Sequence, residues 1–385
     1  MQPDEAHRLF AKRINGLVER EIAPIALAVE STSAFPRQAY DILAREKLFA
    51  LALPRAHGGA EADATTLALM VEGISRVSPS SALLVFPSNA VLRTIAMTAN
   101  QAQQRRLFGE LSAGRTPMAF CLTEPECGSD AARLRTRAKD DGDRYLVSGT
   151  KSFITLGPHA GYYLTFVRTG DDEGAAGISA LLVPRDAPGL TFGEPEKKMG
   201  LHGSVTCQMY LDQVPVSKEL RLWGEGEGWR LLTEVANPMR VWGAAAMALG
   251  VAQGLLDQAL AHALETRDAR GRPLMANQDV AFACADMKIA VEACRSLVYR
   301  VCGMLDRGQG SGRELDGWVS MAKCLAADTA VRLGELASRV MGPAMGSADS
   351  LAGRLFCSAK AIQIFDGSNQ VQRMVVSRNL ARQGR

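Results

Sequence analysis

The segment Ile364–Arg373, which reads IFDGSNQVQR, places a single carboxylate, Asp366, directly before a Gly-Ser pair and after two apolar residues. A glycine in that place commonly ends a helix, because it adopts left-handed backbone angles at little steric cost. Taken alone, the segment predicts a helix end with a solvated acid. A carboxylate held in a cleft is, in contrast, a candidate for acid–base chemistry. The rest of the chain decides between these two interpretations.

The region leading into this segment, from residue 226 onward, carries apolar residues at three- and four-residue spacing in long stretches. That period is typical of helices with one buried face. The four stretches are Val241–His262, Asp279–Leu305, Leu315–Met341 and Arg354–Phe365. Their number and length favour a helical bundle.

Upstream of these helices, residues 116–225 change to short runs rich in β-branched and aromatic residues, separated by Gly, Asp and Pro clusters. The runs are Tyr145–Gly149, Tyr162–Val167, Ile178–Val183 and Gln208–Leu211. This spacing predicts a small antiparallel β-domain, built as a barrel or sandwich.

The first 115 residues again predict helices, among them Ala6–Ile22, Gln38–Leu51 and a buried helix over 81–97, with a loop at Pro24. The expected fold is therefore α+β and mainly α. Its domains are a helical domain over 1–115, a β-domain over 116–225 and a four-helix bundle over 226–385. A β-domain inserted between two helical packs predicts a cleft between them.

The bulk composition excludes several classes of protein. The chain has 385 residues, 47% of them hydrophobic, and a net charge of +3, which is too mild a balance to indicate a nucleic-acid partner. We expect no membrane span, no secretory signal and no structural zinc, because the eight cysteines are scattered singly. Scattered thiols in a chain of this size suit a reducing cytoplasm.

Two motifs about twenty residues apart frame the start of the β-region. Phe120–Asp130 reads FCLTEPECGSD and Gly149–Gly157 reads GTKSFITLG. The loop amides and the hydroxyls of Thr123 and Ser129 offer neutral donors for the edge of a flat ring and for a pyrophosphate. A turn with capping residues is the alternative interpretation of the first motif, and plain β-core chemistry is that of the second.

Two further segments follow in order, Lys198–Ser204 (KMGLHGS) and the glycine-rich Gly224–Trp229 (GEGEGW). The second is neither a P-loop nor a dinucleotide fingerprint, since it lacks the Gly-Lys-Ser/Thr ending and does not start a βαβ unit. Together, the ordered segments resemble the signatures of the FAD-dependent acyl-CoA dehydrogenase family over almost the whole chain.

The resemblance implies a reaction and a set of residues for it. The family removes an α-proton and a β-hydride from an acyl thioester; here Asp366 would take the proton and flavin N5 the hydride. FAD contacts are implied for Phe120, Leu122, Thr123, Gly128, Ser129, Phe153, Thr155, Arg267, Gln278, Ser368 and Gln370, and substrate contacts for Arg240 and Gly367. In relatives, the residues at the positions of Arg267 and Gln278 often reach FAD across a subunit interface.

The chain also departs from the family pattern. Asp366 stands where the family has Glu, one methylene longer, so either the site is adapted to the shorter acid or the reaction differs. The family's other position for the base, beside Arg240, holds Met239, which cannot accept a proton. Arg270 replaces a usual Phe, and Cys357-Ser358 replaces a usual Arg-Asp pair, which bears on FAD affinity and on oligomer geometry.

Several alternatives to a plain acyl-CoA dehydrogenase stay open from the sequence. A flavin oxidase or monooxygenase on the same fold is one, because nitroalkane oxidase resembles this family and uses an Asp base. A homologue without activity is another, and a substrate carried on an acyl carrier protein is a third. The resemblance further implies an electron-transferring flavoprotein as electron acceptor and a homo-oligomer, tetramer or dimer.

Overall fold

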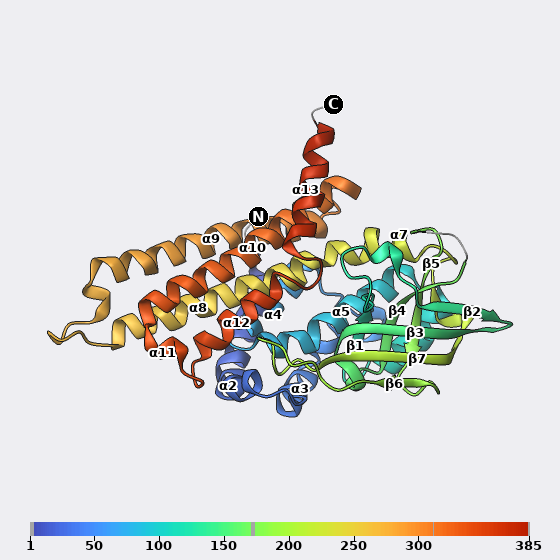
Figure 1. Ribbon diagram of the computed structural model, residues 1–385, viewed down its shortest axis with the longest axis horizontal. Coiled ribbons are helices and arrows are strands. Elements are labelled where there is room, and N and C mark those ends of the chain that lie inside the picture. The colour runs from blue at the N-terminus through green and yellow to red at the C-terminus, as the bar shows by residue number, and fades with distance from the viewer. Residues whose placement is uncertain (1–3, 171–173, 311, 384–385) are drawn as a thin grey trace.

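The computed structural model describes residues 4–170, 174–310 and 312–383 and has three packed regions (Figure 1). Helices from both ends of the chain pack together, and a twisted sheet lies beside them at one end of the molecule. A single hydrophobic core runs through all three regions. The prediction of a mainly helical α+β fold with a central β-region is confirmed.

The N-terminal region is helical, as predicted, but with more helices. They are α1 (Glu5–Leu17), α2 (Ala23–Ser31), α3 (Arg37–Arg45), α4 (Ala64–Ser75), α5 (Pro79–Thr98) and α6 (Gln101–Leu111). The loop predicted at Pro24 is wrong. A π-helical turn, Val18–Ile22, joins α1 to α2, and Pro24 lies in the first turn of α2, so the chain stays helical through Pro24.

The middle region is one eight-stranded sheet with the order β6-β7-β3-β2-β4-β5-β8, and β1 pairs with β4. The strands are β1 (Met118–Cys121), β2 (Arg137–Asp141), β3 (Arg144–Thr155), β4 (Tyr162–Arg168), β5 (Ile178–Pro184), β6 (Leu190–Phe192), β7 (Thr206–Ser217) and β8 (Arg221–Leu222). The prediction of an antiparallel domain is wrong at β1 and β2, which both run parallel to β4. Two intervening strands, β2 and β3, let the chain return in the same direction.

The C-terminal region contains the four predicted long helices as α8 (Ala246–Glu265), α9 (Gln278–Asp306), α10 (Gly312–Met341) and α12 (Leu351–Ile362). The short helices α7 (Gly228–Leu231) and α11 (Pro343–Gly346) and the last helix, α13 (Asn369–Gln383), were not predicted. Helices α8, α9, α10 and α12 lie side by side, while α13 projects away from the body of the molecule (Figure 1). The turn between α12 and α13 contains Asp366.

The N-terminal region and the bundle meet where α4 crosses α8. Two glycines one turn apart on α8, Gly250 and Gly254, allow this close approach. A Cβ at Gly250 would lie 2.3 Å from the carbonyl oxygen of Glu72, and one at Gly254 would lie 2.0 Å from that of Arg76. The bundle that carries Asp366 is thereby fixed against the N-terminal helices.

The sequence analysis expected no membrane span, but two helical segments are long and apolar enough to cross a membrane. Pro79–Thr98 and Gly228–Glu265 both meet the length and hydropathy that a span requires. However, 78% and 72% of their most apolar windows are buried inside the protein. Both are therefore core helices, which agrees with the buried helix predicted over 81–97.

Candidate active site

The turn between α12 and α13 holds Asp366 in an unusual backbone conformation. Asp366 has φ 53° and Gly367 has φ 78°, so two consecutive residues adopt left-handed angles. Such angles cost a non-glycine residue about 1–2 kcal/mol, and they persist only where the surroundings impose them. A side chain at Gly367 is also excluded, since its Cβ would lie 2.4 Å from Nε2 of Gln372.

Arg240 is the nearest cation to Asp366. It comes from the 3₁₀ turn Asn237–Arg240, before α8, and its Nε lies 3.6 Å from Oδ1 of Asp366. Its other nitrogens donate to Oδ1 of Asn237 at 3.1 Å and to Oε1 of Gln372 at 3.4 Å. Arg240 Nε and Asp366 Oδ2 are buried atoms that have no hydrogen-bond partner. Buried charged atoms without partners point to a group that would complete the site.

A polar stripe on α10 supports the turn from below. Lys323 and Ser320 lie on one face of this helix and are almost fully buried. Lys323 Nζ donates to the Gly367 carbonyl at 3.0 Å, and Ser320 Oγ donates to Oε1 of Gln372 at 2.9 Å. One turn earlier on the same face, burial raises the pKa of Asp316, and Arg240 partly offsets this.

The two β-region motifs are joined by a buried ion pair. Lys151 Nζ lies 2.8 Å from Oε1 of Glu124, and both side chains are buried. Glu124 also accepts the backbone N–H groups of Arg135 at 2.6 Å and Thr136 at 2.9 Å. Although burial opposes ionisation, Lys151 and these donors lower the pKa of Glu124. The pair therefore fixes the loop after β1 against β3.

The predicted flavin-side residues gather around this pair. Phe120 lies on β1, and the carbonyls of Leu122 and Thr123 accept from Lys151 Nζ at 3.2 Å and from the Ser152 N–H at 2.8 Å. Gly128 and Ser129 are exposed in the same loop, and Thr155 ends β3. These residues lie on β1, on β3 and in the loop after β1, and they offer backbone amides and hydroxyls.

Phe153 stands out among them. It lies at an irregularity of β3, between Lys151 and Ile154, with φ 57°, and 64% of its surface is exposed. A bulky residue in left-handed conformation is strained, and an exposed aromatic ring there gains no burial in return. A flat partner that covers the ring would explain both observations.

Two predicted residues lie far from this neighbourhood. Arg267 and Gln278 are exposed and flank the connection between α8 and α9. Arg240 precedes α8, whereas Arg267 follows it, and the 20 residues of α8 span roughly 30 Å. That connection lies at the left end of Figure 1, away from the α12–α13 turn. Within one chain, therefore, Arg267 and Gln278 do not join the other site residues.

Comparison with known proteins decides the family. The descriptions "Acyl-CoA dehydrogenase, N-terminal domain", "middle domain" and "C-terminal domain" match residues 4–115, 119–214 and 226–381. The chain belongs to the acyl-CoA dehydrogenase family. It is 36% identical to an acyl-CoA dehydrogenase of Bacillus subtilis over 373 residues, which cover 97% of both chains.

Other members are similarly close. A cyclohex-1-ene-1-carbonyl-CoA dehydrogenase of Geobacter metallireducens is 36% identical over 377 residues, covering 98% of both chains. The butyryl-CoA dehydrogenase structure from Megasphaera elsdenii superposes with a TM-score of 0.93 at 28% identity, covering 99% of both chains. The protein is thus an oxidoreductase of the class that acts on CH–CH groups.

FAD is the cofactor of this acyl-CoA dehydrogenase family member. The described residues fit it. An exposed aromatic ring, Phe153, is held on a strained backbone, and the exposed loop with Gly128 and Ser129 lies on the same sheet. Asp366 Oδ2 and Arg240 Nε are buried polar atoms without a hydrogen-bond partner.

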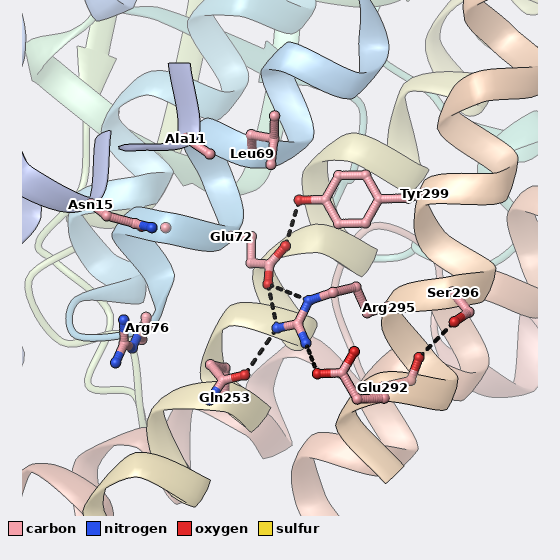
Figure 2. A pocket seen from close by; sticks show the side chains of 11 residues that line it. Ala11, Asn15, Leu69, Glu72, Arg76, Gln253, Glu292, Arg295, Ser296 and Tyr299 are labelled. Atoms are coloured by element: carbon pink, nitrogen blue, oxygen red, sulfur yellow. Dashed lines mark hydrogen bonds and ion pairs between the residues drawn. The ribbon is translucent and has the colours of Figure 1, made fainter. Parts of the chain in front are cut away.

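A cavity of about 610 Å³ lies elsewhere, between α1, α4, α8 and α9, and none of the residues predicted from the sequence lines it (Figure 2). Arg295 donates there to Glu72 at 2.7 Å and to Gln253 at 2.9 Å, and Tyr299 also donates to Glu72. These side chains are hydrogen-bonded to one another. They therefore hold α4, α8 and α9 together and do not act as free reactive groups.

The sequence interpretation missed the supporting residues of the site. Glu124 and Lys151 stood inside quoted motifs, but no role was assigned to them. Ser320 and Lys323 lie within the predicted helix Leu315–Met341, and they interrupt its apolar face. Lysine on a buried face is rare unless it is paired, and this was the available signal.

Proposed function

We propose that this protein catalyses FAD-dependent α,β-dehydrogenation of an acyl-CoA thioester, with Asp366 as the base that removes the α-proton. The observation that carries the proposal is the pair of orphan atoms at Asp366 and Arg240. Oδ2 of Asp366 is buried without a partner, and Arg240 Nε lies 3.6 Å from Oδ1. A carboxylate must be ionised to accept a proton, and Arg240 is the cation that pairs with it.

The residues of the chain have distinct tasks in this proposal. Asp366 Oδ2 accepts the α-proton, and Arg240 holds Oδ1 so that Oδ2 stays free. The glycine that follows, Gly367, has no side chain of its own, which leaves its backbone open to close approach by the substrate. FAD, when bound, supplies the hydride acceptor.

The flavin-side residues are proposed to hold the cofactor. Phe153 contacts the ring, while the loop with Thr123, Gly128 and Ser129, together with Thr155, donates hydrogen bonds. Phe120, Leu122, Ser368 and Gln370 complete the contacts in this proposal. We also propose domain boundaries at 115/116 and 225/226, which the residues matched by the three family domains support.

A coenzyme A thioester is favoured over a carrier-protein substrate by the names of the relatives. The Geobacter metallireducens relative is named for a carbonyl-CoA substrate, and the Megasphaera elsdenii structure is of a butyryl-CoA dehydrogenase. A structure concerned with the electron-transferring flavoprotein of Acidaminococcus fermentans matches with a TM-score of 0.93 at 31% identity. This supports such a flavoprotein as electron acceptor.

We propose the cytoplasm as the compartment, because all eight cysteines are free.

Replacing Phe153 by glycine should separate folding from cofactor binding. Phe153→Gly removes the left-handed strain of a bulky residue, so we expect the FAD-free protein to gain about 1 kcal/mol of stability. The same change removes the exposed ring, so FAD affinity should fall roughly tenfold. Thermal melts of the FAD-free protein and fluorescence titration with FAD measure the two effects. A variant with unchanged FAD affinity would refute the contact between Phe153 and the ring.

A homo-oligomer is proposed because Arg267 and Gln278 cannot reach the site of their own chain. Gln278 lies one turn before Phe282 on α9, and Phe282 and Ile289 are exposed on that face at 58% and 66%. An apolar face beside a predicted cofactor residue suits contact with a second copy of this chain.

Phe282→Asp should therefore dissociate the oligomer and lower FAD retention in the same preparation, because a buried charge is costly at an interface. Light scattering after size exclusion gives the mass, and absorbance gives the FAD content. Leu9→Asp is the matched control, since Leu9 is a similarly exposed apolar residue on α1. Unchanged mass and FAD content in Phe282→Asp would contradict this assignment.

The function is tested by hydrogen exchange at the α-carbon of thioesters that lack a β-hydrogen, such as acetyl-CoA and phenylacetyl-CoA. In D2O, FAD-loaded protein should exchange the α-hydrogen, and proton NMR follows its loss. Exchange reports proton removal alone, because no hydride can leave. If neither thioester exchanges above the rate of buffer, Asp366 does not act as the proposed base on these substrates.

A further inference from the structure

A buried lysine lies beneath the turn that carries Asp366. Lys323 on α10 has no exposed surface, and its ammonium group donates three hydrogen bonds. The acceptors are the carbonyl of Gln363 at 3.4 Å, the carbonyl of Gly367 at 3.0 Å and Oδ1 of Asn369 at 2.9 Å. A charged amine is costly to bury, so its retention here calls for a reason.

The three acceptors enclose the strained residues. Gln363 follows the last residue of α12, Gly367 comes directly after Asp366, and Asn369 begins α13. Lys323 Nζ is therefore hydrogen-bonded to both ends of the turn and to its middle. Left-handed angles at Asp366 require surroundings that impose them, and this is the densest set of bonds to the turn.

The ammonium group of Lys323 also interacts electrostatically with Asp366, the proposed base. Burial lowers the pKa of Lys323 to about 8; Asp366 is the largest opposing influence, while Arg240 adds to the lowering. The C-terminal end of α12, with its negative partial charge, also faces this cation. The ammonium is thus held between a helix end and the carboxylate.

We propose that Lys323 is the positioning residue that holds Asp366 in its reactive place. The inference rests on the proposed function, because it assigns Lys323 a role only through the base. The ammonium form has three N–H donors and satisfies all three acceptors, whereas the neutral amine has two. Loss of its proton therefore breaks one hydrogen bond to the turn. It also removes a positive charge that acts on Asp366.

A pH dependence follows from this arrangement. The charged groups that face Lys323 are Asp366 in the turn, Arg240 before α8, and Cys324 and Asp328 on α10 itself; Arg373 of α13 pairs with Asp328. The rate of α-hydrogen exchange should fall above a pH of about 8, where Lys323 loses its proton. Stability should move in the opposite direction.

The sign for stability follows from proton binding. Lys323 titrates near 8 when folded and near its ordinary value of 10.5 when unfolded, so between these pH values the unfolded chain binds the extra proton. Its contribution to stability therefore rises with pH while exchange declines. If Lys323 had only a structural role, stability and the exchange rate would not change in opposite directions with pH.

The test compares three lysine variants, loaded with FAD, in the α-hydrogen exchange of acetyl-CoA and phenylacetyl-CoA. Lys323→Met should lower the exchange rate about 100-fold, the size expected when a catalytic group is misplaced by about 1 Å. Lys323→Arg keeps a charge that does not titrate. It should retain more of the rate than Lys323→Met and lose the decline above a pH of about 8. Lys360→Gln is the matched control, because Lys360 is exposed on α12 and bonds only the side chain of Gln363.

Two results would overturn the proposal. The first is a folded Lys323→Met variant that exchanges the α-hydrogen at the wild-type rate. The second is a Lys323→Arg variant whose exchange rate still declines at alkaline pH as in the wild type. This second result decides the question if Lys323→Met does not fold. Asp366→Asn is measured in parallel. If Asp366→Asn exchanges as fast as the wild type, the proposed function itself fails, whatever the lysine variants do. Stability against pH, by urea unfolding of wild type and Lys323→Arg, provides the second readout.

Discussion

Asp366→Asn should abolish thioester-dependent flavin reduction, with a rate at least about 10³-fold below that of the wild type, because a general base of this kind contributes roughly 10²–10⁴-fold. Asparagine keeps the size of the side chain but cannot accept the proton. The half-buried position beside Arg240 should be preserved, so FAD content and thermal stability should change little. Anaerobic stopped-flow absorbance measures the reduction rate.

Asp366→Glu is the matched variant for this prediction. It keeps the carboxylate and adds the methylene that the family usually has. Because Lys323 and Gln372 position the backbone of the turn, the longer side chain should move the carboxylate relative to the substrate. We expect a measurable rate between those of the wild type and Asp366→Asn. Equal rates in Asp366→Asn and the wild type would refute Asp366 as the base.

Lys151→Met should destabilise the protein by about 3–5 kcal/mol, because it leaves the buried carboxylate of Glu124 without its cation. The loop after β1 would lose its anchor to β3, so FAD retention should fall as well. Urea unfolding gives the stability, and absorbance of the purified protein gives the FAD content. The pH dependence also has a definite sign. The pKa of Glu124 is lowered, so the pair contributes fully above its ordinary value of 4.5 and is lost as the pH falls through the lower folded value.

Glu126→Gln is the control in the same loop. Glu126 pairs with Arg135, but both side chains are largely exposed, at 66% and 74%. An exposed pair contributes roughly 0–1 kcal/mol, so this variant should unfold close to the wild type. If Lys151→Met and Glu126→Gln lost equal stability, the buried pair would not be the anchor of the loop.

The sequence predicted the parts of the site that lie within one contiguous motif. The FCLTEPECGSD loop, the GTKSFITLG strand and the Asp366 turn each combine local turn chemistry with a recognisable spacing, and they lie after β1, on β3 and between α12 and α13. The long helices from Val241 onward were predicted because each has one apolar face over many turns.

What the sequence did not predict depends on contacts between distant segments. Glu124 and Lys151 are 27 positions apart, and only the pairing of sheet and loop shows that they meet. Lys323 lies 43 residues before Asp366, on a helix whose period gave no sign of the turn packed against it. Pro24 was misread because proline also fits the first turn of a helix. Arg267 and Gln278 lie away from the other predicted site residues within one chain, which the sequence pattern could not show.

The central claim is that this chain oxidises an acyl-CoA thioester through Asp366. An anaerobic titration of the FAD-loaded protein with a panel of straight, branched and cyclic acyl-CoAs tests it most directly, with the visible absorption band of oxidised flavin as the signal. The account predicts rapid bleaching by at least one thioester in the wild type and none by that thioester in Asp366→Asn. Bleaching in both proteins, or in neither with any acyl-CoA while FAD stays bound, would contradict it.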